Sequence, residues 1–83
     1  MIVKKLREIL IKDIGIPQEK MLKLKDDDSL IGKEILNSLS TIKFLMQIEK
    51  TFNIKFSLNS IYKKEFSTLI NIEKNIKKRM ENK

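Results

Sequence analysis

The chain has 83 residues, of which 41% are hydrophobic and 35% are charged. This length fits one domain spanning residues 1–83 and leaves little room for an enclosed active site, because a small domain buries only a modest share of its surface. Cysteine and histidine are both absent, which excludes thiol nucleophiles, disulfides, the usual zinc ligands and the commonest general base. We therefore expect a folded domain that is not an enzyme.

The formal net charge is +7, from 18 basic and 11 acidic residues. Residues 1–25 and 61–83 each carry +4, whereas residues 26–60 carry −1. Two interpretations follow from this distribution: the terminal helices have solvated basic faces, or the chain is a small basic helical module that binds nucleic acid. The sequence shows no aromatic stacking platform and no clear turn between a docking and a recognition helix, which argues against nucleic acid.

Residues 2–14 show the apolar spacing of an amphipathic helix, with steps of three and four between Val3, Leu6, Ile9, Leu10 and Ile14. Gly15 is suited to the left-handed conformation that ends a helix, and Pro17 prevents its continuation. The first residues lack the apolar stretch of a signal peptide, and no run of apolar residues is long enough to cross a membrane. We expect a cytoplasmic protein that does not insert into membranes.

Residues 18–37 have no sustained period, but they contain too many apolar side chains for a freely solvated loop. We expect a long connection that lies on the core, with a short helical turn after Ser29. The run Asp26-Asp27-Asp28-Ser29 offers side-chain caps for that turn. Calcium binding is the alternative, but the later glycine and glutamate of a calcium loop are missing, so we expect no metal site.

A second helix is predicted from Ser38 to Thr51, with Asn37 as its N-cap. Residues 52–56 alternate apolar and polar, and we interpret them as an extended connection because a lone strand has no partner. A brief turn around residues 60–64 leads to a last helix, capped by Ser67-Thr68, with an apolar stripe at Leu69, Ile72, Ile76 and Met80. The predicted fold class is all-α: three longer helices plus one short helix, with a long loop between the first two longer helices.

Ser38 is the most promising chemical group in the chain. No hydroxyl, lysine or carboxylate stands beside an evident base, so an enzymatic mechanism has no visible machinery. A hydroxyl also serves as the passive acceptor of a group that another enzyme delivers, provided that it is exposed at a defined position. Ser38 follows the cap Asn37 in the first turn of a helix, where free backbone N–H groups and the helix dipole favour a phosphate.

These residues resemble a known family. The stretch from Asp28-Ser29-Leu30 to Asn37-Ser38-Leu39 and on to Leu45 is similar to the signature of acyl carrier proteins, in which Asp-Ser-Leu opens the second helix. Residues 48–56 resemble the family's exit from that helix, an acidic stretch followed by Phe-Gly-Ile. The match extends to the helix start at Ser67-Thr68-Leu69, so that the resemblance covers nearly the whole chain.

The resemblance implies a four-helix carrier whose Ser38 receives 4'-phosphopantetheine from coenzyme A through a phosphopantetheinyl transferase, with Asn37 and Leu39 as further cofactor-binding residues. The thiol of that arm holds an acyl or aminoacyl group as a thioester, supplied by a loading ligase and passed to an acyltransferase. In the family, exposed apolar residues of the second helix meet partner enzymes, and we expect such contacts at Leu39, Lys43, Met46 and Ile61. On periodicity alone, Leu39 and Met46 are equally compatible with an ordinary core, whereas the inward positions would be Ile42, Leu45, Ile48 and Phe52.

Asn37 replaces the aspartate that usually precedes the family's serine, so that a carboxylate contacting the transferase or its metal is lost. Lys43 and Lys50 stand where the family is often acidic, and we expect partners with less positive docking surfaces than usual. Residues 62–68, from Tyr62 to Thr68, resemble the segment before the last helix of D-alanyl carrier proteins. Fatty-acid, polyketide and peptidyl carriers remain open alternatives, as does a structural adaptor without a covalent group, and a monomer is expected.

Overall fold

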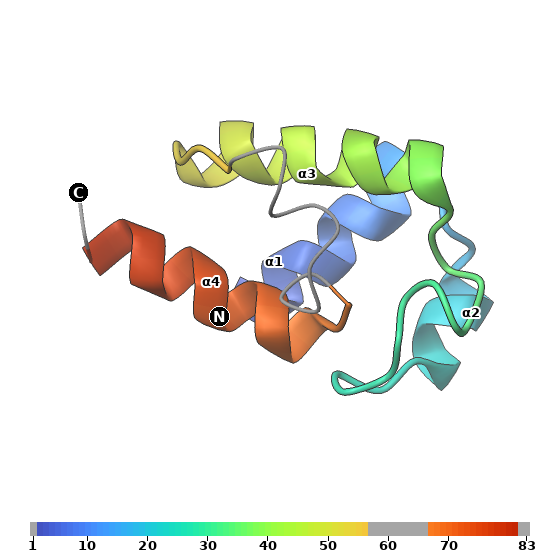
Figure 1. Ribbon diagram of the computed structural model, residues 1–83. Coiled ribbons are helices and arrows are strands. Elements are labelled where there is room, and N and C mark those ends of the chain that lie inside the picture. Colours follow the sequence, from blue (N-terminus) through green and yellow to red (C-terminus); the bar gives the residue numbers. More distant parts are fainter. Residues whose placement is uncertain (1, 57–66, 82–83) are drawn as a thin grey trace.

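The structure is a computed structural model that describes residues 2–56 and 67–81 (Figure 1). Helices form the regular structure of these residues. They are α1 (Ile2–Ile9), the π-helical turn η1 (Leu10–Ile14), α2 (Gln18–Lys23), α3 (Ser38–Phe52) and α4 (Leu69–Glu81). The described ranges contain no strand, and residues 54–56 are irregular. The all-α fold class, with three longer helices and one short helix, is therefore confirmed.

α1 and η1 together form the first predicted helix and end at the predicted residue. Gly15 has a φ of 87° and donates its N–H to the carbonyl of Leu10, five residues earlier. This spacing is that of a π-helix, which is rare and occurs mostly as a single wide turn. Glycine takes the left-handed conformation without a steric penalty, so the helix can stop there.

The position of the short helix corrects the sequence prediction. We expected a long loop with a helical turn after Ser29, but α2 begins directly after Pro17, which is its N-cap. The proline ring fixes φ, here −58°, and removes an N–H that would lack a partner at a helix start. After Ser29 the chain makes a single helical turn, as predicted, in which the Lys33 N–H donates to the Ser29 carbonyl at 2.9 Å, but this turn does not extend into a helix. The turn predicted at residues 60–64 lies outside the described residues.

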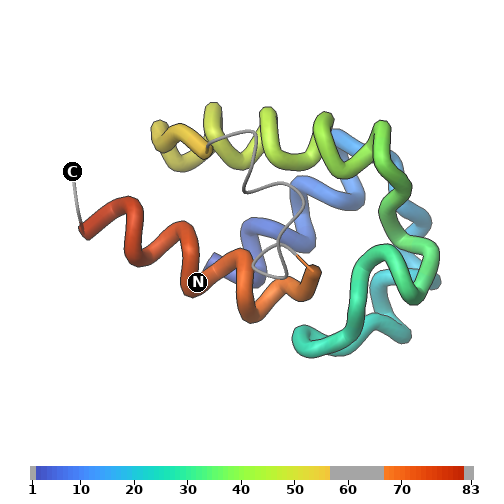
Figure 2. Tube along the Cα trace, viewed as in Figure 1, coloured from blue at the N-terminus to red at the C-terminus, as the bar shows by residue number. Residues whose placement is uncertain are grey.

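A single cluster of buried apolar side chains connects the helices. α1 contacts both α3 and α4, and Figure 2 shows it between them. The connection between α1 and α3 also lies on this core, as predicted, through the buried side chains of Met21, Leu24, Leu30, Ile35 and Leu36. In α4 the predicted stripe is buried at Leu69, Ile72 and Ile76, but Met80, near the end of the helix, is 46% exposed.

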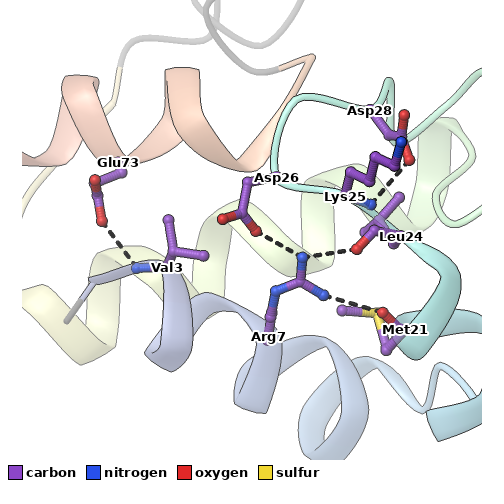
Figure 3. Close-up of polar contacts among 8 residues, drawn as sticks. All are labelled: Val3, Arg7, Met21, Leu24, Lys25, Asp26, Asp28 and Glu73. Atoms are coloured by element: carbon purple, nitrogen blue, oxygen red, sulfur yellow. Dashed lines mark hydrogen bonds and ion pairs between the residues drawn. The ribbon is translucent and has the colours of Figure 1, made fainter.

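Arg7 fixes the segment that follows α2 (Figure 3). Its guanidinium donates hydrogen bonds to the carbonyls of Met21, at 3.0 Å, and Leu24, at 2.8 Å, and pairs with the Asp26 carboxylate at 2.6 Å. Of the predicted cap residues, Asp26 is therefore bound by Arg7 instead, whereas the Ser29 hydroxyl caps the turn that follows it by accepting the Gly32 N–H. The planar guanidinium presents several donors in fixed directions, which suits it to collecting carbonyls from one irregular segment.

The other acidic residues and Ser29 act within their own loop. Asp28 accepts a hydrogen bond from the Lys25 N–H at 2.9 Å, and the Ser29 hydroxyl accepts one from the Gly32 N–H at 2.9 Å. Within the described ranges, no group of three or more acidic side chains is placed to hold a metal ion. Backbone bonds from Leu30 to Ser67, at 2.9 Å, and from Ile70 to Asp26, at 3.1 Å, join this loop to the start of α4. The path of the chain toward α3 is thus held at several points.

Candidate functional site

Ser38 is the first residue of α3, and its side chain is exposed. The preceding residue, Asn37, is the N-cap, as predicted. Its side-chain oxygen accepts the Ser40 N–H at 2.9 Å, and the Ser40 hydroxyl in turn accepts the Asn37 N–H at 2.8 Å. These reciprocal bonds form a capping box, which fixes the residue at which the helix begins.

Thr41 adds a further bond at the same helix start. Its hydroxyl donates to the Asn37 carbonyl at 2.6 Å, and its backbone N–H donates to the same oxygen at 2.9 Å. Thr41 is buried, so that this side of the first turn is packed against the core. Ser38, in the same turn, stays exposed to solvent at a defined position.

The Ser38 hydroxyl and the first backbone N–H groups of α3 have no partner in the part of the chain that the structure describes. The hydroxyl makes no hydrogen bond there, and neither do the backbone N–H groups of Ser38 and Leu39. The first N–H groups of a helix have no acceptor within the helix, and together with the helix dipole they attract anions. A phosphate ester on Ser38 would therefore stand beside donors that are otherwise satisfied by water.

A shallow hollow of about 450 Å³ lies beside Ser38. Its lining comes from the turn before α3 and from the first residues of the helix: Ile31, Glu34, Ile35, Leu36, Asn37 and Ser38. Ile31 is 60% exposed, whereas Ile35 and Leu36 are buried. No local sequence pattern indicates this hollow, because it arises where the loop approaches the helix.

The outward face of α3 has an apolar ridge formed by Leu39, Ile42 and Met46, which are 66%, 42% and 54% exposed. Exposure of Leu39 and Met46 agrees with the partner-facing alternative, but the prediction that Ile42 faces inward is wrong. The core positions of α3 are Thr41, Phe44, Leu45 and Ile48, with Phe52 half-buried against the core. The outward ridge and the core positions both have helical spacing, so that periodicity alone could not tell which side of α3 faces the core.

The charges on the outward side of α3 are mainly basic. Lys43 and Lys50 are exposed and form no ion pair within the described ranges. The acidic residue of the helix, Glu49, is half-buried and accepts the Phe56 N–H at 2.8 Å. Its carboxylate is therefore partly engaged within the chain. Ile61, the fourth predicted contact residue, lies outside the described residues.

A family model for the phosphopantetheine attachment site matches residues 4–75. The chain belongs to this family. The family is defined by covalently attached 4'-phosphopantetheine, and its carrier domains are generally non-catalytic and work with partner enzymes such as transferases and ligases. No curated protein and no solved structure matches the chain.

The membership agrees with the acyl carrier resemblance of the sequence. It supports a phosphopantetheine carrier role for this protein in general terms. Among the described helices, none has the length and apolar character needed to span a bilayer. Family membership does not by itself identify the residue that holds the arm, the carried group or the partner enzymes.

Proposed function

We propose that this protein is a carrier in which Ser38 holds 4'-phosphopantetheine and presents acyl or aminoacyl thioesters to partner enzymes. The proposal depends above all on the exposed Ser38 hydroxyl at the capped start of α3. When bound, the arm supplies a terminal thiol on which a carried group forms a thioester. The chain's own contribution is to hold, orient and present this group.

The groups around Ser38 fit a phosphodiester. The two free N–H groups at the helix start and the dipole of α3 favour its negative charge, an effect worth about 0.3–1 kcal/mol at an exposed site. The energy is small, which suits an arm that has to leave the surface when a partner takes its cargo. The hollow beside Ser38 gives the first atoms of the arm a surface to lie against.

Attachment at Ser38 is a substitution at phosphorus. The Ser38 oxygen forms a bond to the phosphorus that bears the pantetheine group of coenzyme A, and the pyrophosphate P–O bond breaks. Adenosine 3',5'-bisphosphate leaves, and the hydroxyl proton passes to the transferase or to solvent. Since His and Cys are absent from the chain and no base approaches Ser38 in its described part, activation of the hydroxyl is assigned to the transferase.

Partner enzymes are proposed to dock on the outward face of α3. The apolar ridge of Leu39, Ile42 and Met46 begins next to Ser38, so that a bound partner has access to the arm. Exposed apolar side chains that line up on one face are typical of recognition surfaces. Because Lys43 and Lys50 flank this ridge, the complementary partner surface is an apolar groove with acidic residues around it. Ile61 stays a predicted contact.

The finer assignments stay predictions: a D-alanyl cargo, a cytoplasmic location, a monomer and a single domain over residues 1–83. The residues that suggest the D-alanyl subtype, from Tyr62 to Thr68, lie largely outside the described ranges. Genes for an adenylating enzyme and a membrane acyltransferase beside the gene for this chain would support that subtype. Their absence would favour another carrier class.

The attachment proposal is tested by incubating the protein with coenzyme A and a broad-specificity phosphopantetheinyl transferase and measuring its intact mass. The wild type and Ser40→Ala should each gain one phosphopantetheine, whereas Ser38→Ala should gain none. Ser40→Ala is the matched control, because it removes a neighbouring hydroxyl of the same helix turn. If the wild type stays unmodified under conditions that convert a control carrier, or if Ser38→Ala is modified, the proposal is wrong.

A further inference from the structure

A second hollow adjoins the one beside Ser38. It has a volume of about 310 Å³ and lies between α2 and the turn before α3, lined by Lys20, Lys23, Leu24, Lys33, Glu34 and Ile35. The two hollows have Glu34 and Ile35 in common, so that they are adjacent, and a path along the surface from Ser38 reaches the first hollow before the second. A flexible arm attached at Ser38 would pass over the first hollow and arrive at the second.

The second hollow combines an apolar floor with a cationic rim. Leu24 and Ile35 are 5% exposed and belong to the core, so they form the floor. Lys20, Lys23 and Lys33 are exposed and pair with no carboxylate within the described ranges. Glu34 is the single acidic residue in the lining, which leaves the lining with a net charge of +2.

The first hollow is different, because its lining contains no lysine or arginine. Positive charge is therefore concentrated away from Ser38, at the far end of the path, where the tip of an arm would lie. Three unpaired lysines around one apolar depression repel one another, and an anion placed among them lowers that repulsion. Aliphatic lysine stems also line such a depression while the ammonium groups stay in water.

We propose that the hollow lined by Lys20, Lys23 and Lys33 holds the anionic end of the cargo. The cargo is then an acyl group with a free terminal carboxylate. This inference rests on the proposed function of Ser38. The apolar floor receives the methylene chain of such a cargo, and the lysines receive its terminal carboxylate. A cargo with a neutral end gains only the apolar contact and is held less well.

The test compares two cargoes of equal chain length on the ¹⁵N-labelled protein. The transferase attaches the acyl-phosphopantetheine arm from glutaryl-coenzyme A or from pentanoyl-coenzyme A, which differ in a terminal carboxylate against a methyl group. The glutaryl form should shift the amide signals of residues 20–24 and 33–35 relative to the pentanoyl form. The glutaryl thioester should also hydrolyse several-fold more slowly on the wild type than on Lys20→Glu/Lys23→Glu, since a carboxylate held by the lysines is not free to attack its own thioester carbonyl.

Charge reversal at the rim should remove this difference. In Lys20→Glu/Lys23→Glu the two cargoes should give the same amide signals at residues 20–24 and 33–35, and the glutaryl thioester should hydrolyse faster than on the wild type. The control Lys74→Glu/Lys78→Glu changes the net charge equally on exposed positions of α4 and should behave like the wild type. Equal shifts from both cargoes in the wild type, or no shift in either region, would overturn the proposal.

The failure of this inference differs from a failure of the attachment site. If Ser38 accepts neither arm, the proposed function is wrong, and the hollow is then tested by titrating the unmodified protein with glutaryl-pantetheine and pentanoyl-pantetheine. Preferential shifts by the glutaryl compound at residues 20–24 and 33–35 would support the cationic hollow. The absence of a preference would contradict it.

Discussion

Both sides of α3 carry large apolar side chains, but their surroundings differ. The inward side, with Phe44, Leu45 and Ile48, is enclosed by the rest of the chain, whereas Leu39 and Met46 on the outward side are more than half exposed. The comparison separates two roles within one helix. Inward side chains stabilise the fold, and outward ones are left available for a surface that the chain itself does not supply.

The largest expected effect comes from matched substitutions on these two sides. Leu45→Ala should destabilise the protein by about 2–5 kcal/mol, because it removes a buried side chain and leaves a cavity. Leu39→Ala should change the free energy of unfolding by no more than about 0.5 kcal/mol, since its side chain is solvated already. Urea unfolding followed by circular dichroism measures both. Equal losses would contradict the division of the helix into two sides.

Arg7 makes polar contacts within the chain, with two backbone carbonyls and with the Asp26 carboxylate. Arg7→Met should cost about 2–3 kcal/mol, because hydrogen bonds to a charged group are lost and the carbonyls of Met21 and Leu24 lose their donor. Asp26→Asn should cost less, about 0.5–1 kcal/mol, since the bonds to both carbonyls stay. Urea unfolding of both variants gives the comparison. A larger loss for Asp26→Asn would show that the ion pair, and not the carbonyl contacts, anchors this segment.

The exposed lysines on the outward face of α3 are expected to affect how well the transferase binds the protein. A transferase that serves acidic carriers should modify Lys43→Glu/Lys50→Glu about fivefold more efficiently than the wild type, an effect of roughly 1 kcal/mol. The ratio kcat/KM with coenzyme A in excess measures this effect. Lys74→Glu/Lys78→Glu has the same net charge and should show a smaller change. Equal gains in both variants would indicate that total charge, rather than the face of α3, determines docking.

Asn37 is expected to have a modest effect on stability through the cap of α3. Asn37→Ala should cost about 1 kcal/mol through the lost cap, which lowers the Tm of a domain of this size by about 4–8 °C. Asn37→Asp should alter stability by only a few tenths of a kcal/mol, because aspartate caps a helix about as well as asparagine. Thermal unfolding measures both. The same Asn37→Asp variant should be modified faster by a transferase, since it restores the carboxylate that the family usually has before its serine.

The sequence predicted those features that depend on neighbouring residues. Gly15 and Pro17 located the end of the first helix, and Asn37 located the start of α3, because caps act within one turn. The short helix α2 was missed, since six residues are too few to establish a period, although Pro17 is suited to a helix start as well as to an end. The orientation of Ile42 was also missed, because α3 is apolar on two sides and only packing against η1 and α1 selects one.

The site was predictable in part for the same reason. The exposed position of Ser38 followed from its capped helix start, which is a local feature. The hollow beside it and its cationic neighbour depend on how Arg7 and the backbone of residues 26–30 hold the loop against the bundle. Such contacts join residues that are far apart in sequence, and no local pattern indicates them.

Attachment of the arm at Ser38 is tested most simply by locating the added mass within the chain. After treatment with the transferase and coenzyme A, trypsin should release residues 34–43 as one peptide, which contains the hydroxyls of Ser38, Ser40 and Thr41. Fragmentation by tandem mass spectrometry assigns the added mass to one of them. We predict that all of the phosphopantetheine is on Ser38. Phosphopantetheine on Ser40 or Thr41, or outside this peptide, would show that Ser38 is not the attachment site.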